Sequence, residues 1–355
     1  MTVRSSASYY NYTLYGDMSA RVMRVLSGFT PNLEIYSIDE AFLGLPGFEL
    51  RLETHARELR QTVLQWTGIP VSVGIAPTKT LAKVANRIAK KDAASGGVRL
   101  LLDSAAPREA LAKLELTDLW GVAGRLAARL SAIGITTPLE LRDADSRLIR
   151  ERFSVVLERM VLELRGVACI GLEEVTPDRK SLIASRSFGK RVETRRGLEE
   201  AVSVYTARAA EKMRRQNLAT ASLAVWIETN GFKPEERQYS ASKSVRLSVA
   251  TADTGKLIEA ATAALSIIFK QGYRYKKAGV TFLELVPAGR VQGGLFDQPD
   301  DARSISRMYA VDELNARFGR GTIGFGTAGE RRVWHLRREF ISPRYTTDWN
   351  ELLQV

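Results

Sequence analysis

The amino-acid sequence predicts an α+β protein with several domains. Its 355 residues exceed the length of one typical domain, so roughly two to four domains are expected. Hydrophobic spacing alternates between helical and extended in the first part of the chain, becomes helical, and then alternates again. Together these observations indicate a mixed fold, for which we predict four segments. The segments cover residues 1–110, 111–175, 176–290 and 291–355.

The first segment alternates helices and strands. Apolar residues at helical spacing mark its amphipathic helices, and short β-prone runs bounded by turn residues mark its strands. The predicted elements are, in order, a helix over 13–28, a hairpin over 33–45, a helix over about 50–66, a strand over 71–75, a helix opening near Thr78, and a strand over 98–102.

The rest of the chain divides into three patterns. Residues 115–168 are helical and compact, and the polar stretch 176–180 is a plausible linker. The order after it, β-α-β-β-α-β, is the split βαβ arrangement, with two helices on one face of a four-stranded sheet. From about residue 291 the pattern is less regular. The predicted elements after the linker are a strand over 182–189, a helix over 196–216, strands over 220–228 and 241–248, a helix over 253–270 and a strand over 276–285.

Positive charge is concentrated in one part of the chain. The whole sequence carries a net charge of +12 and has a pI near 9.8, which favours a polyanionic partner. Between residues 178 and 290 there are 21 Lys or Arg against 11 Asp or Glu, a net charge of +10. A concentrated charge on a small sheet domain indicates contact with a phosphate backbone, whereas charge that serves only solubility would need no such clustering.

Other features of the composition exclude several classes. The single cysteine, Cys169, cannot form an intramolecular disulfide, so a reducing cytoplasm is expected. His55 and His335 lack cysteine partners at zinc spacing, which argues against a zinc site. No apolar run reaches membrane-spanning length, so no membrane partner is expected.

Two adjacent acids, Asp39 and Glu40, interrupt the predicted hairpin, whose other residues are mainly apolar. Neighbouring side chains on a flat strand point to opposite faces, but at a hairpin tip both carboxylates can converge. Mg²⁺ prefers oxygen ligands and uses a few carboxylates together with substrate phosphates. The pair therefore suits a metal site that holds a nucleoside triphosphate for in-line displacement. An acidic turn without any ligand is the competing interpretation.

Longer motifs surround this pair. They are Y-S-I-D-E-A-F-L-G-L at 36–45, V-G-I-A-P-T-K-T-L-A-K-V-A-N-R-I-A-K-K at 73–91, W-G-V-A-G at 120–124, R-S-F-G at 186–189, R-Y-K-K-A-G-V at 274–280 and S-P-R-Y-T-T at 342–347. Over essentially the whole chain they resemble the Y-family translesion DNA polymerases, and the last of them resemble the bacterial UmuC branch of that family.

The resemblance implies a domain plan and an activity. Residues 1–110 would form the palm and fingers, 111–175 a helical thumb with a helix-hairpin-helix, and 176–290 the little finger. Residues 291–355 would hold a clamp-binding peptide and a partner-binding tail. The implied activity is error-prone, template-directed DNA synthesis with Mg²⁺ in the SOS response. The implied partners are template-primer DNA, a deoxynucleoside triphosphate, the sliding clamp, a processed UmuD dimer and the recombinase filament.

The resemblance also implies residue roles. Asp39 and Glu40 would be catalytic metal ligands, and Lys83 would contact the incoming triphosphate. For Lys83 the competing interpretation is a solvated helix face, because basic residues recur along that helix at helical spacing. The implied DNA contacts are Lys190, Arg191, Arg246, Lys276 and Lys277. The implied clamp contacts are Gln292, Leu295 and Phe296, for which a flexible linker is the competing interpretation.

Some family features are absent. The resemblance implies an opening palm strand of the type D-x-N-x-F-Y that carries the first metal-binding aspartate, and no such motif occurs in this sequence. Asp17, interpreted as a helix-start residue, and Glu34, on the strand leading into the hairpin, do not obviously replace it. We therefore expect this chain alone to be a poor or inactive polymerase. Ala123 also replaces the second glycine of the thumb motif, which leaves its grip on phosphate open.

Two other functions compete with polymerase activity. A non-catalytic remnant could keep the DNA-binding and clamp-binding surfaces. An RNA-binding module is the third class, because many RNA readers share the β-α-β-β-α-β order and stack bases on aromatic side chains of central strands. The aromatic residues on the predicted strands are Phe188, Trp226 and Phe282, and they do not form the usual cluster.

Overall fold

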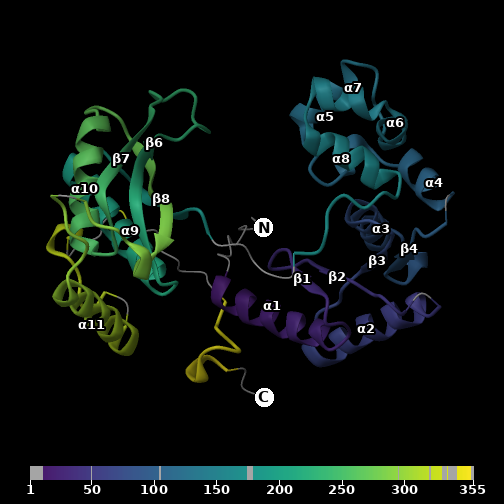
Figure 1. The fold of residues 1–355 in the computed structure, drawn as a ribbon, viewed down its shortest axis with the longest axis horizontal. Coiled ribbons are helices and arrows are strands. Elements are labelled where there is room, and N and C mark those ends of the chain that lie inside the picture. The colour runs from purple at the N-terminus through teal and green to yellow at the C-terminus, as the bar shows by residue number, and fades with distance from the viewer. Residues whose placement is uncertain are drawn as a thin grey trace, which may run out of the picture. The chain divides into compact units, whose positions relative to one another are not determined.

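The computed structural model describes residues 11–48, 50–103, 105–173, 179–294, 296–319, 321–329, 334 and 342–352. The chain divides into two compact units (Figure 1). The first comprises residues 1–176 and 340–355, and the second comprises residues 177–339. Among the described residues, no helix combines the length and apolar character needed to cross a membrane.

The first unit begins with two helices under a hairpin. Helix α1 (Tyr12–Ser27) packs against α2 (Leu52–Thr67) through a core that includes Val22, Leu26 and Val63. The hairpin strands β1 (Leu33–Ile35) and β2 (Ala41–Leu43) add Leu33 and Leu43 to this core. Both helices and the hairpin lie close to their predicted positions.

The start of α1 corrects one interpretation. Asn11 is the N-cap of the helix, and its side-chain oxygen accepts a hydrogen bond from the Leu14 N–H over 3.2 Å. Asp17 lies within the helix and pairs with Arg21 four residues later, at 2.8 Å. Reading Asp17 as a helix-start residue was therefore wrong, because an amide rather than a carboxylate caps the first turn.

A second short sheet carries the lysine-rich helix. Strand β3 (Val73–Ile75) pairs in parallel with β4 (Val98–Leu100), and α3 (Lys79–Lys91) and the turn η1 (Ala93–Ser95) connect them. A Cβ on Gly74 would lie 2.1 Å from the Asn86 backbone nitrogen. The helix therefore lies directly on β3, and only glycine allows this close approach. This fixes α3 relative to the strand before it.

The helical part of the first unit joins the same core. Residues of α3, including Leu81 and Val84, are buried together with Leu111, Leu130 and Val161 of this part. The lysine helix and the helical part are therefore one packed body. The helical elements are α4 (Ala106–Ala112), η2 (Leu116–Asp118), α5 (Gly124–Ser131), α6 (Pro138–Asp143), α7 (Ser146–Arg152) and α8 (Val155–Leu164).

The second unit contains the predicted β-α-β-β-α-β order. Its four strands form an antiparallel sheet in the order β5-β8-β6-β7, so β8 lies between the two strands that α9 connects. This is the split βαβ arrangement, and both helices cover one face of the sheet (Figure 1). The elements are β5 (Leu182–Val192), α9 (Arg195–Arg214), β6 (Leu218–Glu228), β7 (Ser240–Thr251), α10 (Thr254–Ile268) and β8 (Tyr275–Pro287).

The segment after this sheet is more regular than predicted. Following the turn η3 (Ala288–Arg290), helix α11 (Ala302–Phe318) packs against the second unit. Only Ser304 and Met308 of this helix are buried, although Ile305, Tyr309, Leu314 and Phe318 recur along it and stay exposed. The expectation of an irregular tail was therefore wrong for residues 302–318.

The two ends of the tail belong to different units. The buried Trp334 packs against Phe188 and Tyr205 of the second unit, with ring centroids 5.9 and 5.7 Å away. Asn11 of the first unit instead donates to the Ser342 carbonyl over 2.7 Å. The short turns η4 (Gly326–Ala328) and η5 (Trp349–Glu351) complete the described elements.

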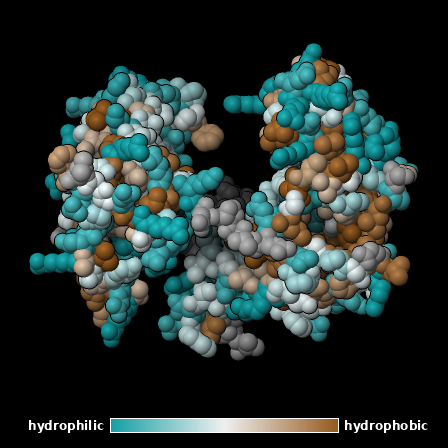
Figure 2. Space-filling view, in the orientation of Figure 1, coloured by the Kyte–Doolittle hydropathy of each residue, from teal (hydrophilic) through white to brown (hydrophobic). Residues whose placement is uncertain are grey.

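Surface polarity differs between regions of the face drawn in Figure 2. Hydrophobic residues gather over β3 and β4 of the first unit, whereas the second unit is largely hydrophilic on this face. The hydrophilic surface agrees with the concentration of charged residues in that part of the sequence.

Candidate active site and DNA-binding surface

The acidic pair lies at the tip of the β1–β2 hairpin, as predicted. Ile35 pairs with Ala41, and the backbone N–H groups of Tyr36 and Ser37 both donate to the Glu40 carbonyl, over 3.1 and 3.0 Å. This tight tip places Asp39 on the exposed outer side and leaves Glu40 half-buried. The strand alternation is broken at this point, which frees both carboxylates from the core.

The two carboxylates have different partners. Asp39 accepts a hydrogen bond from the Ser37 hydroxyl over 2.6 Å. Glu40 forms an ion pair with Lys83 of α3, at 3.1 Å between Oε2 and Nζ. The hairpin tip and the lysine helix are therefore in direct contact, but through one carboxylate of the pair.

The basic face of α3 is covered. Thr78 caps the helix by accepting from the Leu81 N–H over 3.3 Å. Three basic residues then recur along one face, and each pairs with an acid from another element. Lys79 pairs with Glu34, Lys83 with Glu40, and Arg87 with Asp118. At Lys83 itself a solvated helix face does not describe the surface, since only 19% of that side chain is exposed, whereas Arg87 is 40% exposed and Lys90 is exposed.

Two buried acids organise the site: Glu34, considered above only as a replacement metal ligand, and Glu163, which the sequence did not point to. Glu34 pairs with the buried Lys79 and also accepts from the Glu173 N–H over 2.7 Å. Glu163 of α8 is fully buried and accepts from the backbone N–H groups of Thr80, Cys169 and Ile170, over 3.0, 2.7 and 3.1 Å. Both therefore hold the chain after α8 against the hairpin and the start of α3. Glu163 lies in an ordinary amphipathic pattern, so the sequence contained no signal for this role.

The carboxylates at the tip fit a metal ion that is held partly by a substrate better than one held by the protein alone. Within the described residues, no group of three or more His, Cys, Asp or Glu side chains could hold a metal ion. Asp39 and Glu40 nevertheless supply hard oxygen ligands beside a lysine, and Mg²⁺ is often held by one or two carboxylates plus substrate phosphates. The donor set thus fits Mg²⁺ that binds together with a triphosphate.

Two of the predicted DNA contacts lie on the helix-free face of the second unit's sheet. Lys277 lies over the Trp226 ring at 4.9 Å, and its Nζ is 3.6 Å from Glu228. Arg246 is 80% exposed and forms a long ion pair with Glu284, at 3.7 Å. A Cβ on Gly279 would lie 2.4 Å from the Trp226 ring, so glycine lets this ring lie flat on the neighbouring strand. The face combines two cations with a smooth surface.

The other predicted DNA contacts are placed differently. Lys190 is exposed at the end of β5. Arg191 forms an ion pair with Glu236 and is 15% exposed, so a contact with phosphate would require that pair to break. The Lys276 ammonium donates to the Phe188 carbonyl over 2.8 Å. All five DNA contacts stay predictions. Of the five, the structure places only Lys277 and Arg246 on the helix-free face of the sheet.

The aromatic residues considered for RNA stacking are not arranged for it. Phe188 and Phe282 are fully buried in the core of the second unit. Trp226 is left on the helix-free face, next to Lys277. These three residues therefore do not provide the pair of exposed aromatic rings on central strands that base stacking needs.

The predicted clamp-binding peptide lies between the sheet and α11. Gln292 is exposed and Phe296 is 94% exposed, whereas Leu295 lies outside the described residues. Gly294 donates its N–H to the Asp297 carbonyl over 2.8 Å, which closes a turn around this position. An exposed aromatic side chain on a surface turn is compatible with a peptide that binds an apolar pocket.

Three comparisons with known proteins agree with this architecture. The impB/mucB/samB family matches residues 5–87, the C-terminal domain of that family matches 179–295, and a domain of unknown function, DUF4113, matches 308–355. Protein UmuC of Salmonella typhimurium is 43% identical over 97% of this chain and 83% of its own length. Protein MucB of Escherichia coli is 40% identical over 96% and 81%, and DNA polymerase IV of Moorella thermoacetica is 30% identical over 88% and 76%.

A solved structure shows the same fold. The Y-family DNA polymerase chimera Dbh-Dpo4(243-245)-Dbh superimposes with a TM-score of 0.60, at 20% identity over 77% of this chain and 76% of that one. The fold is thus that of the Y-family DNA polymerases. Within this class, the chain belongs to the impB/mucB/samB family of UmuC-type proteins. The predicted resemblance is confirmed.

Proposed function

We propose that this protein carries out error-prone, template-directed DNA synthesis across damaged bases. The observation that supports this most directly is the contact between the acidic hairpin tip and the lysine helix, where Glu40 and Lys83 meet at 3.1 Å. Membership of the UmuC-type family and the sheet face with Lys277 and Arg246 add to it. The substrates would be template-primer DNA and deoxynucleoside triphosphates.

In this proposal the residues of the tip divide the work. Asp39 and Glu40 would hold Mg²⁺, which when bound neutralises charge on the triphosphate and favours in-line displacement. Lys83 would bind the phosphates that leave. The primer 3′ oxygen attacks the α-phosphate, and pyrophosphate departs with the electrons of the broken P–O bond. The present Glu40–Lys83 ion pair keeps both groups at the place where they are needed.

The subdomain names follow from the same proposal. The hairpin, the two short sheets and α3 would be the palm and fingers, and helices α4–α8 the thumb. The second unit's sheet would be the little finger, with its helix-free face along the DNA duplex. Residues 292–296 would bind the sliding clamp. Binding to a processed UmuD dimer and to a recombinase filament is proposed from the family alone.

A second candidate is a DNA- and clamp-binding protein without catalysis. It is favoured by the acids at the tip, because among the described residues no group of three or more His, Cys, Asp or Glu side chains could hold a metal ion, and Asp39 and Glu40 have different partners. Such a protein would bind template-primer DNA and occupy the clamp without extending a primer. Both candidate functions use the same DNA-binding and clamp-binding surfaces. They differ only in whether the metal site catalyses synthesis.

Primer extension separates them. The full chain is incubated with Mg²⁺, four deoxynucleoside triphosphates and a primed template, with or without an abasic site. Synthesis that Glu40→Gln and Lys83→Ala abolish supports the polymerase. DNA binding without synthesis supports the second candidate, whereas synthesis that survives both substitutions contradicts the assigned roles.

A further inference from the structure

Trp120 connects the helical part of the first unit with the acidic hairpin. It lies in the loop between η2 and α5, and its indole N–H donates to the Tyr36 hydroxyl oxygen over 3.0 Å. The two rings meet edge to face at 5.4 Å and 89°, and Trp120 also lies 5.9 Å from Phe42. The indole is therefore held in one orientation by a hydrogen bond and by packing on two rings.

The ammonium group of Lys83 lies against both held rings. Its Nζ is 4.5 Å from the centre of the Tyr36 ring and 4.7 Å from that of Trp120. Aromatic faces attract cations at such distances, and more strongly when water is partly excluded. A lysine stem is otherwise flexible. The two rings thus fix an ammonium group whose side chain is 19% exposed.

The end of η2, just before this loop, contacts α3 a second time. Asp118, two residues before Trp120, pairs with Arg87 and lies 4.0 Å from Lys91. Arg87 is one helical turn beyond Lys83. Residues 118–120 therefore bind two successive turns of α3, so the position of the loop and the position of Lys83 are linked.

We propose that Trp120 is a positioning residue for triphosphate binding. Together with Tyr36 it holds the Lys83 ammonium where the phosphates arrive. A phosphate oxygen that reaches the Lys83 ammonium would compete with the Glu40 carboxylate for it, so binding would loosen or replace the 3.1 Å ion pair. The aromatic rings keep Lys83 in place during this exchange, and the environment of the indole changes with it. This inference rests on the proposed function of Lys83.

The test uses inorganic triphosphate with Mg²⁺, which does not absorb where tryptophan does. Wild-type chain, Trp120→Phe, Trp120→Leu and Tyr36→Phe are titrated by calorimetry for affinity and by tryptophan fluorescence for location. Trp66→Phe is the matched control, because Trp66 is a 70% exposed tryptophan on α2. Lys83→Ala tests the underlying assignment. Far-ultraviolet circular dichroism checks that each variant is folded.

We expect a saturable fluorescence change in the wild type and in Trp66→Phe, and its loss in Trp120→Phe. Trp120→Leu should bind triphosphate roughly three- to tenfold more weakly, because the cation loses one aromatic face. Trp120→Phe restores a face and should bind within about twofold of the wild type. Tyr36→Phe removes only the accepting hydroxyl and should fall between the two.

The outcomes distinguish this inference from the proposed function. If Lys83→Ala loses binding while Trp120→Leu binds as the wild type does, Trp120 does not position the lysine and the inference is overturned. If Lys83→Ala binds normally, or the wild type does not bind, the role of Lys83 fails and both proposals fall. If the Trp120→Leu chain does not fold, Tyr36→Phe decides by the same criterion: weaker binding than in the wild type supports the inference, and wild-type binding overturns it.

Discussion

Buried acids and aromatic rings around α3 show how single residues shape the site. Glu34 and Glu163 each combine a side chain removed from water with several hydrogen-bond donors. An unpaired buried carboxylate would be costly, whereas one that accepts several N–H bonds is stabilised and fixes its neighbours. These residues do not contact a substrate, but they determine where Lys83 and Glu40 lie.

At this scale we predict that Glu163→Gln loosens the chain after α8. A neutral amide can accept at only one of its two terminal atoms, so at least one of the three backbone donors loses its partner. The expected loss of local stability is about 1–3 kcal/mol. Hydrogen exchange at the amides of Thr80, Cys169 and Ile170 measures it.

The control is Glu151→Gln, which changes an exposed acid on α7. It should leave exchange at those three amides unchanged. Equal protection in Glu163→Gln and in the wild type would mean that the buried acid does not hold this segment.

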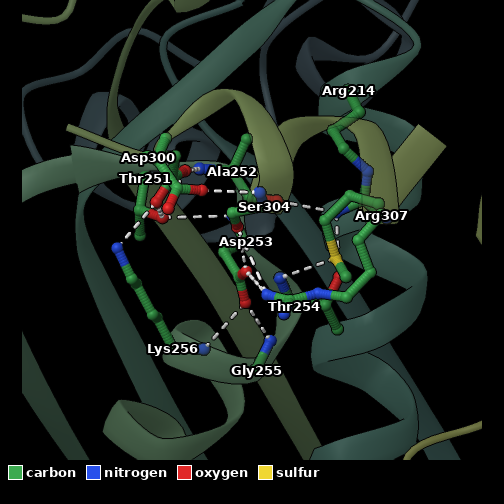
Figure 3. A network of polar contacts seen from close by, with 12 residues as sticks. Arg214, Thr251, Ala252, Asp253, Thr254, Gly255, Lys256, Asp300, Ser304 and Arg307 are labelled. Atoms are coloured by element: carbon green, nitrogen blue, oxygen red, sulfur yellow. Dashed lines mark hydrogen bonds and ion pairs between the residues drawn. The ribbon is translucent and has the colours of Figure 1, made fainter.

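At the scale of elements, α11 is attached by ionic contacts rather than by a large apolar face (Figure 3). Arg214 of α9 is buried, and its guanidinium donates to both carboxylate oxygens of Asp312 at 2.7 Å. Asp253 caps α10 and accepts from Ser304 and Arg307 of α11. Asp300, just before α11, accepts from Lys256 over 2.8 Å and from Thr251. This network decides where the segment with Phe296 is presented.

The pKa shifts of this network predict how docking of α11 depends on pH. Burial raises the pKa of Asp253 and Asp300, but hydrogen bonds from Ser304, Arg307, Lys256 and Thr251 outweigh it and hold both below the ordinary 3.8. A carboxyl whose pKa is lowered on folding stabilises docking at any pH above its ordinary pKa. This stabilisation is lost as the pH falls through the lowered pKa of the folded protein. Lys256 has a raised pKa, chiefly because of its hydrogen bond to Asp300. Its contribution to the stability of docking is therefore fully present below pH 10.5 and is lost as the pH rises through the raised pKa.

We therefore expect α11 to stay docked across neutral pH and to detach as the pH falls below the ordinary 3.8 of these carboxyls, before the sheet unfolds. Hydrogen exchange of α11, compared with that of β6, measures this. Asp253→Asn should bring the loosening to neutral pH, because it removes the charge that Arg307 contacts. If α11 exchanges independently of pH and of this substitution, the ionic contacts do not hold the helix.

A clamp-binding prediction belongs to the same segment. Leu295→Ala together with Phe296→Ala should reduce binding to the sliding clamp at least tenfold, because anchors of this kind supply most of a peptide's apolar contact. Surface plasmon resonance with immobilised clamp measures it, with Phe232→Ala as the control for loss of an exposed phenylalanine of the same unit. Unchanged binding would show that residues 292–296 are not the clamp-binding peptide.

For the whole molecule, the arrangement of charge matters more than its sum. The net charge of +12 is concentrated in the second unit, but many of those cations are paired with acids. The helix-free sheet face presents Lys277 and Arg246, which lie 3.6 and 3.7 Å from Glu228 and Glu284. The helix face presents exposed cations such as Arg196, itself 3.4 Å from Glu200, and Lys212. Only a surface that meets DNA should contribute to the salt dependence of binding.

We predict that Lys277→Glu together with Arg246→Glu weakens duplex binding by the full chain. The slope of log K against log salt should become shallower by about 0.9 for each lost phosphate contact. Fluorescence anisotropy at several salt concentrations measures both quantities. Arg196→Glu with Lys212→Glu makes the same change in net charge on the other face and should leave the slope nearly intact. Equal effects of the two pairs would show that net charge, not the sheet face, governs binding.

Much of the fold could be predicted because its signals are local. Hairpin residues 33–45, the α3 region and the β-α-β-β-α-β order have clear periodicity, and their elements lie within a few residues of the predictions. Helix α11 was missed because it buries only two side chains and its docking depends on ion pairs with distant residues. The pairing of Arg191 and the role of Glu163 were missed for the same reason: their partners lie 45 and up to 83 residues away.

The sequence by itself determined the family, the order of elements, the acidic tip and the concentration of positive charge, since each depends on residue type and short-range spacing. Tertiary structure alone decided which charges are free and which are neutralised. Glu40 faces Lys83 rather than its neighbour Asp39, and Trp120 covers that lysine from a loop 37 residues further along the chain. Ion pairs and ring contacts act over a few ångströms in space, so only the folded chain shows which residues meet.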